Sequence, residues 1–476
     1  MPQAKRQHQT QALHPESAHA IVIGGSIAGL LAARMLTDHF ERVTIVERDP
    51  LPSEPKARPG VPQSQHTHIL LTQGYHSLET LFPGIGDSLV AQGATRIDWL
   101  AECPIMFPSG WAPRFPSEIK APLCSRTLLE QVIRQQLERN DRIRWATPCT
   151  VTQFIHHPQR AALRAVQLKD AHGKTTELSA QLIVDASGRN SHAPQWLQHL
   201  GYAPPQETII DSGLGYASRW YRRPREFSED WKSIYVMAQA PNYPCLGALF
   251  QLEDDRWLVT LMGINHNYPP TNDAGFLDFA SHLRSSVIYE AIKTAEPLSE
   301  IYSYRGTANR QRHYEKLTQL PENFISIGDA TCAFNPVYGQ GVTIAAESAI
   351  ILGQCLQHQH ERYGAGQWTG FSQYFHQQLV SVTRTPWLMA TGEDLRWPQT
   401  VGNQPDLMTR LMQWYMDQVI SLINEDGDVY QAFLEVIHRL KAPTSLLHPQ
   451  ILKKVLAKRI SHPSGEVSTS SVPGQL

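Results

Sequence analysis

The sequence has few cysteines and no cysteine pattern of a structural site. Only six occur in 476 residues, they are widely scattered, and none forms a CxxC pair. Structural zinc sites and disulfide-stapled secreted folds need closely spaced cysteines, so we expect neither. Acidic and basic residues nearly balance, at 44 Asp and Glu against 42 Lys and Arg, and no long basic run occurs. We therefore expect no nucleic-acid partner, because such a partner requires a sustained positive surface.

Long apolar runs are also missing. No window approaches 18 uninterrupted apolar residues, and the N-terminus lacks the apolar stretch of a signal peptide. We expect a cytoplasmic protein with no integral membrane segment. The segment 448–460, HPQILKKVLAKRI, is basic and amphipathic. It either touches a membrane peripherally or docks as a helix on its own protein, and the pattern leaves both open.

What is present is a series of short apolar segments joined by glycine turns and helical patterns. Residues 20–23 and 43–46 read as buried strands on either side of a helix. The segments 181–187 and 323–330 contain further strands of the same buried kind. Continuous apolar strands of this kind are typical of a parallel sheet. The sequence therefore predicts an α/β nucleotide-binding domain assembled from two separate pieces of the chain.

The rest of the chain has other patterns. Between the two pieces, aromatic-rich segments alternate polar and apolar residues, with a hairpin signal at residues 253–255. From about residue 341 the pattern becomes helical. We predict these parts: disordered tails at 1–18 and 461–476, a nucleotide-binding domain from 19–202 and 306–360, an inserted β-sheet domain at 203–305, and a helical region at 361–460.

The turn after the first strand reads GGSIAG, residues 24–29, and Glu47 ends the second strand. Gly24 permits the tight turn, and Gly29 lets the helix pack closely on the strand. The helix N-terminus then offers free amides and partial positive charge to a diphosphate, while Glu47 can accept hydrogen bonds from ribose hydroxyls. Ser26 replaces the middle glycine of the usual pattern. The order strand, turn, helix, strand and acid still predicts a dinucleotide site.

A second motif, GDATCAFNPVYGQG, occupies residues 328–341. Asp329 follows a buried strand and can bind a polyol hydroxyl. Pro336 stiffens the loop after it, and the glycines at 339 and 341 let backbone amides approach a flat ring or a phosphate. Cys332 is interpreted as a small buried residue.

These motifs, together with SRTLLE at 125–130 and VDASGRNS at 184–191, resemble the FAD-dependent monooxygenases of the aromatic-hydroxylase and squalene-epoxidase superfamily. Three further stretches are similar to bacterial flavin epoxidases and hydroxylases of natural-product pathways, such as the polyether-antibiotic epoxidases: RPGVPQSQHTHILLTQG (58–74), YPPTNDAGF (268–276) and PWLMATGEDLRWP (386–398). The resemblance covers about residues 19–455.

The resemblance implies a fold class and a cofactor. The fold would be α/β, with an FAD-binding Rossmann-like domain of the glutathione-reductase type, an inserted mixed or antiparallel sheet that binds substrate, and C-terminal helices. Arg126 would approach the diphosphate of FAD, although an exposed arginine at a helix start is the alternative. The implied cofactor contacts are Gly24, Gly25, Ser26, Ala28, Gly29, Glu47, Arg48, Arg58, Val61, Arg126, Asp185, Gly328, Asp329, Pro336, Gly339, Gln340, Gly341 and Val342.

The implied activity is epoxidation or hydroxylation of a large hydrophobic polyketide, terpenoid or indole-type substrate by molecular oxygen, through a flavin hydroperoxide. NADPH or NADH would supply the electrons. Aromatic hydroxylases have Asp-Gly where this chain has Asp185-Ala186, and no second GxGxxG follows a strand. Both departures weaken direct nicotinamide binding, so a separate flavin reductase is an expected partner.

The stretch QHTH, residues 65–68, raises the question of a metal site. In a strand His66 and His68 would share a face, whereas in a helix they would point about 200° apart. The spacing of the following leucines favours a helix beginning here, so we assign no metal site. His66 is then a candidate catalytic residue, as a proton donor or a flavin hydrogen-bond partner, and a satisfied structural histidine is the equal alternative.

The inserted sheet supplies candidate substrate-pocket residues, each of which could instead be plain core. They are Tyr216, Trp220, Tyr235, Phe250 and Trp257.

Three rival functions use the same nucleotide fold. A flavin-dependent halogenase should carry a Trp-x-Trp-x-Ile-Pro stretch, which this sequence does not contain. A flavin-dependent reductase of prenyl-like chains would turn over without oxygen. A flavoprotein that binds FAD and a ligand without catalysis would consume no oxygen.

Overall fold

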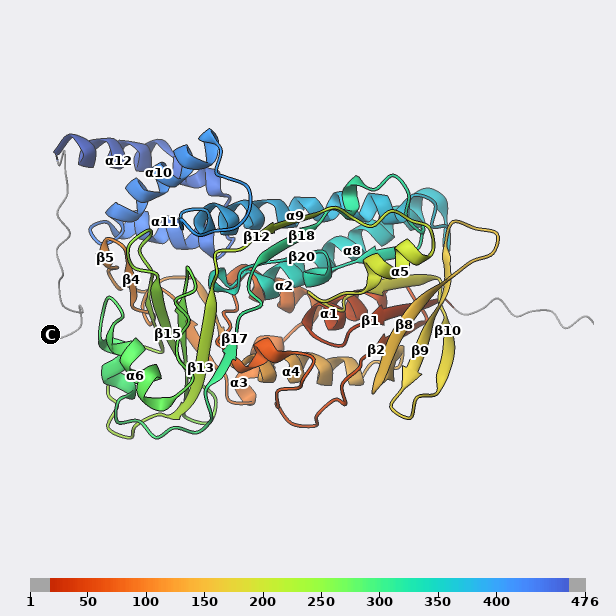
Figure 1. Cartoon of the computed structure of the whole chain (residues 1–476), viewed down its shortest axis with the longest axis horizontal. Helices are drawn as coiled ribbons and strands as arrows, with labels where there is room; N and C mark the ends of the chain where they lie inside the picture. Colours follow the sequence, from red (N-terminus) through yellow and green to blue (C-terminus); the bar gives the residue numbers. More distant parts are fainter. Residues whose placement is uncertain (1–17, 462–476) are drawn as a thin grey trace, which may run out of the picture.

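The computed structural model describes residues 18–461. The predicted disordered tails lie outside the described residues, apart from Ala18 and Ser461. Within the described range the elements follow an α/β order with a late helical region, and their arrangement is seen in Figure 1.

A five-stranded parallel sheet forms the first layer. Strand β1 lies at its centre, and every residue of β1 is buried because both faces of the sheet are covered. All of its neighbouring pairs run parallel, which confirms the sheet predicted from the buried strands. In spatial order the strands are β19 (Phe324–Ser326), β11 (Leu182–Asp185), β1 (His19–Ile23), β2 (Arg42–Val46) and β7 (Ile143–Ala146).

Helices cover one face of this sheet and a second small sheet covers the other. Val22 and Ile45 pack with the helices, whereas Ile21 and Ile183 pack with the small sheet. The helices are α1 (Ile27–Leu36), α2 (Thr72–Leu81), α3 (Ile85–Ala91), α4 (Arg126–Glu138), α8 (Gly341–Tyr363) and α9 (Phe371–Asp394). The small sheet consists of β8 (Cys149–His156), β9 (Leu163–Asp170) and β10 (Thr175–Ser179), at the right of Figure 1. Helix α5 (Ala193–His199) packs beside it.

A seven-stranded sheet forms the second unit. Its long central strands are antiparallel, and the hairpin between β15 and β16 turns at Asp254 and Asp255, whose φ angles are +62° and +52°. This confirms the hairpin predicted at residues 253–255. Strands β4 and β5 also belong to this sheet, although they lie outside the inserted domain predicted at residues 203–305. Strand β14 pairs with β4 in parallel, so the sheet is mixed. The order is β17 (Tyr302–Tyr304), β13 (Gly215–Arg222), β16 (Arg256–Gly263), β15 (Cys245–Leu252), β14 (Ser233–Val236), β4 (Ile105–Phe107) and β5 (Gly110–Trp111).

Two short sheets link these units. One pairs β3 (Thr95–Asp98) with β6 (Lys120–Leu123), and the other joins β12 (Glu207–Ile210), β18 (Asn309–Arg312) and β20 (Cys332–Ala333). Helices α6 (Asp273–Ser281) and α7 (Val287–Ile292) cover the outer face of the seven-stranded sheet.

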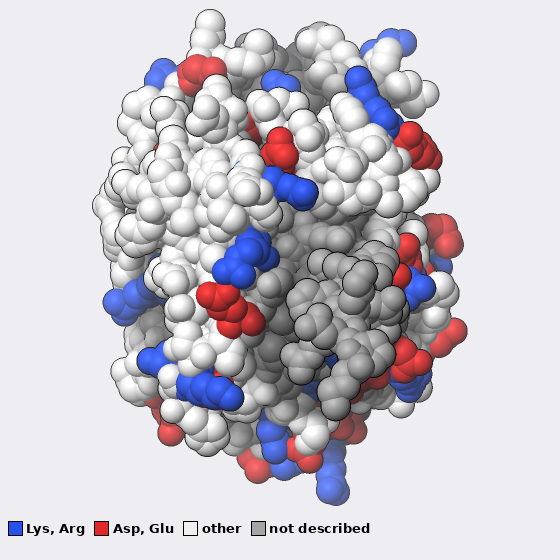
Figure 2. Space-filling view, turned by 90° about the vertical axis from the view of Figure 1, so that its right-hand side faces the viewer, with Lys and Arg blue, Asp and Glu red and all other residues white. Residues whose placement is uncertain are grey.

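The last three helices cover the other face of that sheet, at the upper left of Figure 1. They are α10 (Leu407–Leu422), α11 (Gly427–Ile437) and α12 (Pro449–Ser461). Helix α12 buries Ile451 and Val455 and pairs Lys454 with Asp426 at 2.7 Å, so it docks on its own protein. None of the helices between residues 18 and 461 has the length and apolar character needed to span a bilayer. On the face shown in Figure 2, basic and acidic side chains are interspersed.

Candidate functional site

The GGSIAG turn is held where the parallel strands end. Gly24 has a φ of +105°, and its amide donates to the carbonyl of Val46 at 2.8 Å, so β1 and β2 fix the turn together. A methyl group on Gly29 would lie 1.8 Å from the carbonyl oxygen of Gly24. Ser26 caps α1, and its hydroxyl makes no capping hydrogen bond but bonds instead to Glu130 and Arg126 of α4. Glycine is therefore required at 24 and 29 for the turn to form.

Glu47 braces this turn from the end of β2. Its two carboxylate oxygens accept hydrogen bonds from the backbone amides of Gly25 at 2.8 Å and Asp49 at 2.9 Å. It also pairs with Arg58 Nη1 at 3.0 Å. The neighbouring Arg48 is exposed and donates to the carbonyl of Gly60 at 3.4 Å. Glu47, at the end of β2, therefore helps to hold the GGSIAG turn in place.

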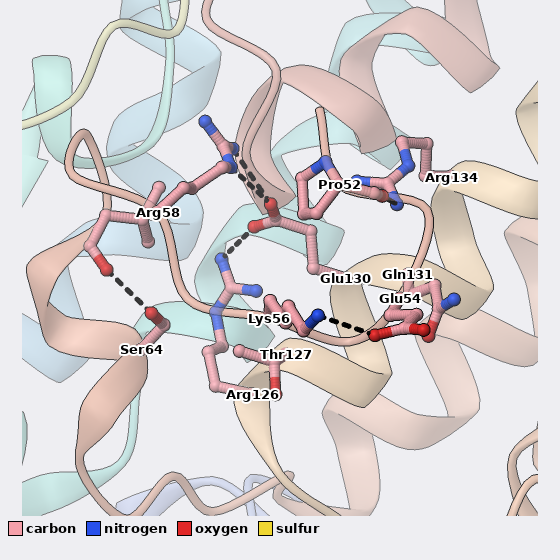
Figure 3. Close-up of a pocket in the computed structure, with 11 residues that line it drawn as sticks. Pro52, Glu54, Lys56, Arg58, Ser64, Arg126, Thr127, Glu130, Gln131 and Arg134 are labelled. Atoms are coloured by element: carbon pink, nitrogen blue, oxygen red, sulfur yellow. Dashed lines mark hydrogen bonds and ion pairs between the residues drawn. The ribbon is translucent and has the colours of Figure 1, made fainter. Parts of the chain in front are cut away.

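A buried ion-pair network joins the turn to α4 (Figure 3). Glu130 Oε1 accepts from Arg58 Nη2 at 2.8 Å and Nε at 3.0 Å, while Glu130 Oε2 pairs with Arg126 Nη2 at 2.9 Å. Ser26 Oγ donates to the same oxygen at 3.0 Å. Burial opposes ionisation of Glu130, but Arg126 and Arg58 outweigh it and lower the pKa of Glu130. Val61 and Ser64 complete the wall beside Arg58.

One hydrogen-bond donor of Arg126 has no partner in this network. Its side chain is 5% exposed, and Nη1 has no hydrogen-bond partner within residues 18–461. Burial lowers the pKa of Arg126, and the charge of Glu130 opposes that effect. The arginine is thus not at the surface, and a buried donor of this kind is costly unless it meets an acceptor. The geometry suits an anion beside the GGSIAG turn.

The second motif converges on the same place. Gly328 has a φ of +63°, and Asp329 follows it at the carboxyl end of β19. Burial raises the pKa of Asp329, whereas the charges of Arg189 and Arg126 act in the opposite direction. A methyl group on Gly328 would lie 2.6 Å from the Ala28 side chain, so the two glycine motifs, far apart in the chain, form one site.

A loop beyond Asp329 leads into α8. Asn335 caps the short turn Pro336–Tyr338, and Gly339 follows with a φ of +63°, where a methyl group would lie 3.1 Å from Ile69 Cβ. A methyl group on Gly341 would meet nothing within 4 Å. Gln340 Oε1 and Thr343 Oγ1 are buried and lack partners in the described part of the chain, and Val342 beside them is also buried. The start of α8 therefore combines the free amides of a helix N-terminus with a buried, unpaired side-chain acceptor of Gln340.

The QHTH stretch is not the start of a helix. Residues 62–65 form a short 3-10 turn, His66 is extended with φ −115° and ψ 166°, and α2 begins only at Thr72. The predicted helix start at 65–68 is therefore wrong, because the segment crosses between the two units. There the amide of Thr67 donates to Thr260 Oγ1 of the seven-stranded sheet at 3.1 Å, and Leu70 and Leu71 are buried, with Leu71 extended.

His66 itself lies against β13. Its Nδ1 is 2.7 Å from Ser218 Oγ, and its ring meets the Tyr216 ring edge-on at 4.3 Å between centroids. Burial, with a smaller contribution from His68, lowers the pKa of His66 to about 3. The imidazole is therefore neutral near pH 7 and can exchange hydrogen bonds but not act as an imidazolium acid. Within residues 18–461 no cluster of His, Cys, Asp and Glu could hold a metal ion.

The five aromatic residues predicted for the pocket do not share a face. Tyr216, Trp220, Tyr235 and Phe250 pack on the side of the C-terminal helices, but Trp257 lies on the opposite side against Phe227 and Trp231. Only Tyr216 meets His66, and β17 adds Tyr304 at 5.6 Å from the Tyr216 ring.

Asp185 is tied into its own loop. It accepts hydrogen bonds from Ser191 Oγ at 2.5 Å and from both the amide and hydroxyl of Ser187, and it is fully buried. Two residues of the site escaped the sequence reasoning, Glu130 and Arg189. The i, i+4 spacing of Arg126 and Glu130 in SRTLLE is a signal for the first, whereas Arg189 is marked only by its place in VDASGRNS.

Comparison with known proteins identifies the class of fold. The flavin-dependent brominase Bmp2, as a triple mutant, superimposes with a TM-score of 0.64 at 13% identity over 93% of this chain and 99% of its own. A flavoprotein/dehydrogenase from Cytophaga hutchinsonii gives 0.65 at 17% identity over 94% and 100%. PqsL of Pseudomonas aeruginosa, described as a probable FAD-dependent monooxygenase, gives 0.58 at 14% identity over 79% and 97%. The fold is thus that of FAD-dependent monooxygenases and halogenases, which confirms the predicted fold class.

At the level of sequence, Protein Rv3254 of Mycobacterium tuberculosis is 31% identical over 348 residues, which cover 71% of this chain and 73% of that protein. The chain belongs to the same family as Protein Rv3254. No family model matches the chain.

Proposed function

We propose that the protein is an FAD-dependent monooxygenase that epoxidises or hydroxylates a large hydrophobic polyketide, terpenoid or indole-type substrate. The observation that carries this proposal is Arg126, a buried guanidinium beside the GGSIAG turn whose Nη1 lacks a partner in residues 18–461. The diphosphate of a dinucleotide is an anion of suitable charge for that position. The flavin-dependent proteins of the same fold support FAD as the dinucleotide.

The residues of both motifs fit the proposed FAD. The GGSIAG turn with Glu47, Arg58 and Arg126 would bind its ADP part, and Asp329 would bind its ribityl or diphosphate region. The 336–341 loop would face the ring system, where the amides at the start of α8 favour negative charge. Bound FAD, once reduced, would supply the oxygen-activating chemistry by which one atom of molecular oxygen enters the substrate and the other leaves as water.

The chain's own contribution to the reaction would be positioning and exclusion of water. His66, Ser218 and Thr260 form a buried hydrogen-bonded series, with Ser218 Oγ 2.6 Å from Thr260 Oγ1. A neutral His66 in this series can donate or accept a hydrogen bond at a reacting group without carrying a charge. Tyr216 and Tyr304 would exclude water from the same side.

Electrons would come from NADPH or NADH, either directly or through a separate flavin reductase. Asp185 already has Ser187 and Ser191 as partners, and this favours the separate reductase, because the acid that serves nicotinamide in aromatic hydroxylases is occupied within its own loop.

The decisive experiment supplies the purified protein with FAD, a flavin reductase, NADPH and a panel of hydrophobic alkene and aromatic substrates under oxygen-18 gas. A product heavier by one labelled atom supports the proposal. Turnover of a prenyl-like substrate without oxygen would instead identify a reductase, and FAD binding without oxygen use would identify a non-catalytic flavoprotein. Incorporation of added bromide would indicate a halogenase, the activity of the brominase that shares the fold.

The site assignment has a separate test. Asp329→Ala and Glu47→Ala should lose FAD, with the milder loss for Glu47→Ala, because Glu47 is replaced in part by the remaining acids around Arg58. The measurement is the visible absorbance that stays with the protein after gel filtration. Full retention by both variants would contradict the assignment.

A further inference from the structure

A buried carboxylate lies behind the 336–341 loop. Asp394, the last residue of α9, belongs to the PWLMATGEDLRWP motif, and it is 1% exposed. Its hydrogen-bond partners are neutral. They are Asn309 Nδ2 at 2.7 Å, Asn335 Nδ2 at 2.9 and 3.0 Å to the two oxygens, and the Tyr338 hydroxyl at 3.2 Å. A buried charge held by neutral donors is costly, and this makes Asp394 a candidate for a role beyond packing.

These partners close a ring around the start of the loop. The amide of Asn335 donates to Asn309 Oδ1 at 2.7 Å, and Asn335 Oδ1 accepts from the amide of Val337 at 3.0 Å. Asp394 therefore fastens the asparagine that caps the turn Pro336–Tyr338 to both α9 and β18. Tyr338 is held from the same carboxylate, so both ends of the turn are tied to one side chain.

A carboxyl group suits the centre of this ring. Its two oxygens accept bonds from three donor groups and carry no hydrogen of their own when ionised. An amide at the same position would turn an NH₂ group toward Asn335 or Asn309, whose own NH₂ groups point at it. Burial raises the pKa of Asp394 to about 6, despite the hydrogen bonds from Asn335, Tyr338 and Asn309.

We propose that Asp394 is a positioning residue that fixes the 335–341 loop, and with it Gln340 and the α8 N-terminus, in the arrangement that faces the flavin ring. This inference rests on the proposed function, because the loop acts on a flavin only if FAD binds. It differs from a merely structural anchor in one respect. Movement of the loop changes the electrostatic surroundings of the ring as well as the stability of the fold.

The test compares Asp394→Asn with a matched control and a designed rescue. The control is Asp98→Asn, because Asp98 likewise accepts bonds from neutral groups, Ser117 and Leu100, in its own distant loop. The rescue is the double variant Asp394→Asn/Asn335→Asp. In it the amide introduced at 394 donates to the carboxylate introduced at 335, while both the Asn309 and Val337 bonds are kept. Tyr338→Phe removes a single bond and serves as a milder variant that keeps the fold.

Two readouts are used. The first is hydrogen exchange of the peptide spanning 333–343 in the FAD-free protein, which we expect to speed up about tenfold in Asp394→Asn, as for the loss of one buried hydrogen bond. Tyr338→Phe should show a smaller increase, the rescue should return toward wild type, and Asp98→Asn should not change this peptide. The second is the reduction potential and visible spectrum of bound FAD, which should shift in the same order.

The outcomes separate the two proposals. Unchanged exchange in Asp394→Asn and Tyr338→Phe overturns the inference. Faster exchange with an unaltered flavin potential and spectrum also overturns it, because Asp394 would then be an anchor without effect on the ring. If the wild-type protein binds no FAD, the proposed function fails and the flavin part of the inference fails with it. The exchange data of the FAD-free protein still decide whether Asp394 holds the loop.

Discussion

Replacement of Glu130 by Gln tests the ion-pair network that holds the diphosphate side of the site. Both oxygens of Glu130 are used, by two nitrogens of Arg58, by Arg126 Nη2 and by the Ser26 hydroxyl. Glutamine keeps the shape but removes the charge, and its NH₂ group then faces a guanidinium. Breaking a buried ion pair by removing one partner costs about 3–5 kcal/mol. Because Glu47 and Asp49 still pair with Arg58, we expect a loss near the lower bound, about 3 kcal/mol.

The assay is urea unfolding of the FAD-free protein at neutral pH, with Glu138→Gln as the matched control. Glu138 lies on the same helix, is 51% exposed, and pairs with Arg134 Nε at 3.5 Å, so its replacement should change the unfolding free energy by less than about 0.5 kcal/mol. The pKa of Glu130 is lowered in the folded state, so its contribution is present above the usual glutamate pKa and is lost as pH falls through the lowered value. The difference between wild type and Glu130→Gln should therefore shrink in acid. Equal stability of wild type and Glu130→Gln at neutral pH would refute the reasoning.

Three further predictions concern other parts of the site. Gly29→Ala puts a methyl 1.8 Å from the Gly24 carbonyl oxygen and should abolish FAD retention, whereas Gly392→Ala, with nothing within 4 Å, should leave it intact. His66→Gln should slow turnover without removing an ionisation from the pH profile between about pH 5 and 8, because His66 is already neutral there; loss of an acidic limb near pH 6 would contradict this. The pKa of Asp394 is raised to about 6, so the stability it confers when protonated is complete below the usual aspartate value and is lost as pH rises through about 6. In urea unfolding, the free energy of unfolding of the wild type should fall by up to about 3 kcal/mol between pH 4 and 6 relative to that of Asp394→Asn. If the free energies of unfolding of the two proteins change with pH in parallel, this titration is excluded.

Much of the first motif could be predicted from local sequence. Gly24 and Gly29 are required by contacts within one strand-turn-helix unit, so the pattern GGSIAG carries its own geometry. The hairpin at Asp254 and Asp255 is local in the same sense. The prediction of a helix at QHTH is wrong for the opposite reason. His66 is extended because Ser218 and Thr260 of a distant sheet bind this segment, and those contacts leave no periodic trace in the sequence.

The aromatic residues show a second limit of prediction from sequence. Alternation places side chains on two faces of a strand but does not say which face meets a given partner. The sequence pattern therefore groups Trp257 with Tyr216, although the two lie on opposite sides of the sheet. The basic helix α12 is ambiguous in sequence in the same way, and only its packing against α10 and the turn at 443–447 shows where its apolar side lies.

The sequence by itself determined the βαβ unit, the glycine turns and the acid at the end of β2, because each depends on residues close together in the chain. Long-range packing places Glu130 between Arg58 and Arg126, keeps His66 neutral by burial, and brings Asp394 to the 335–341 loop. In each case the effect comes from burial beside groups far away in sequence. Desolvation and charge pairing depend on that three-dimensional neighbourhood, which no local pattern records.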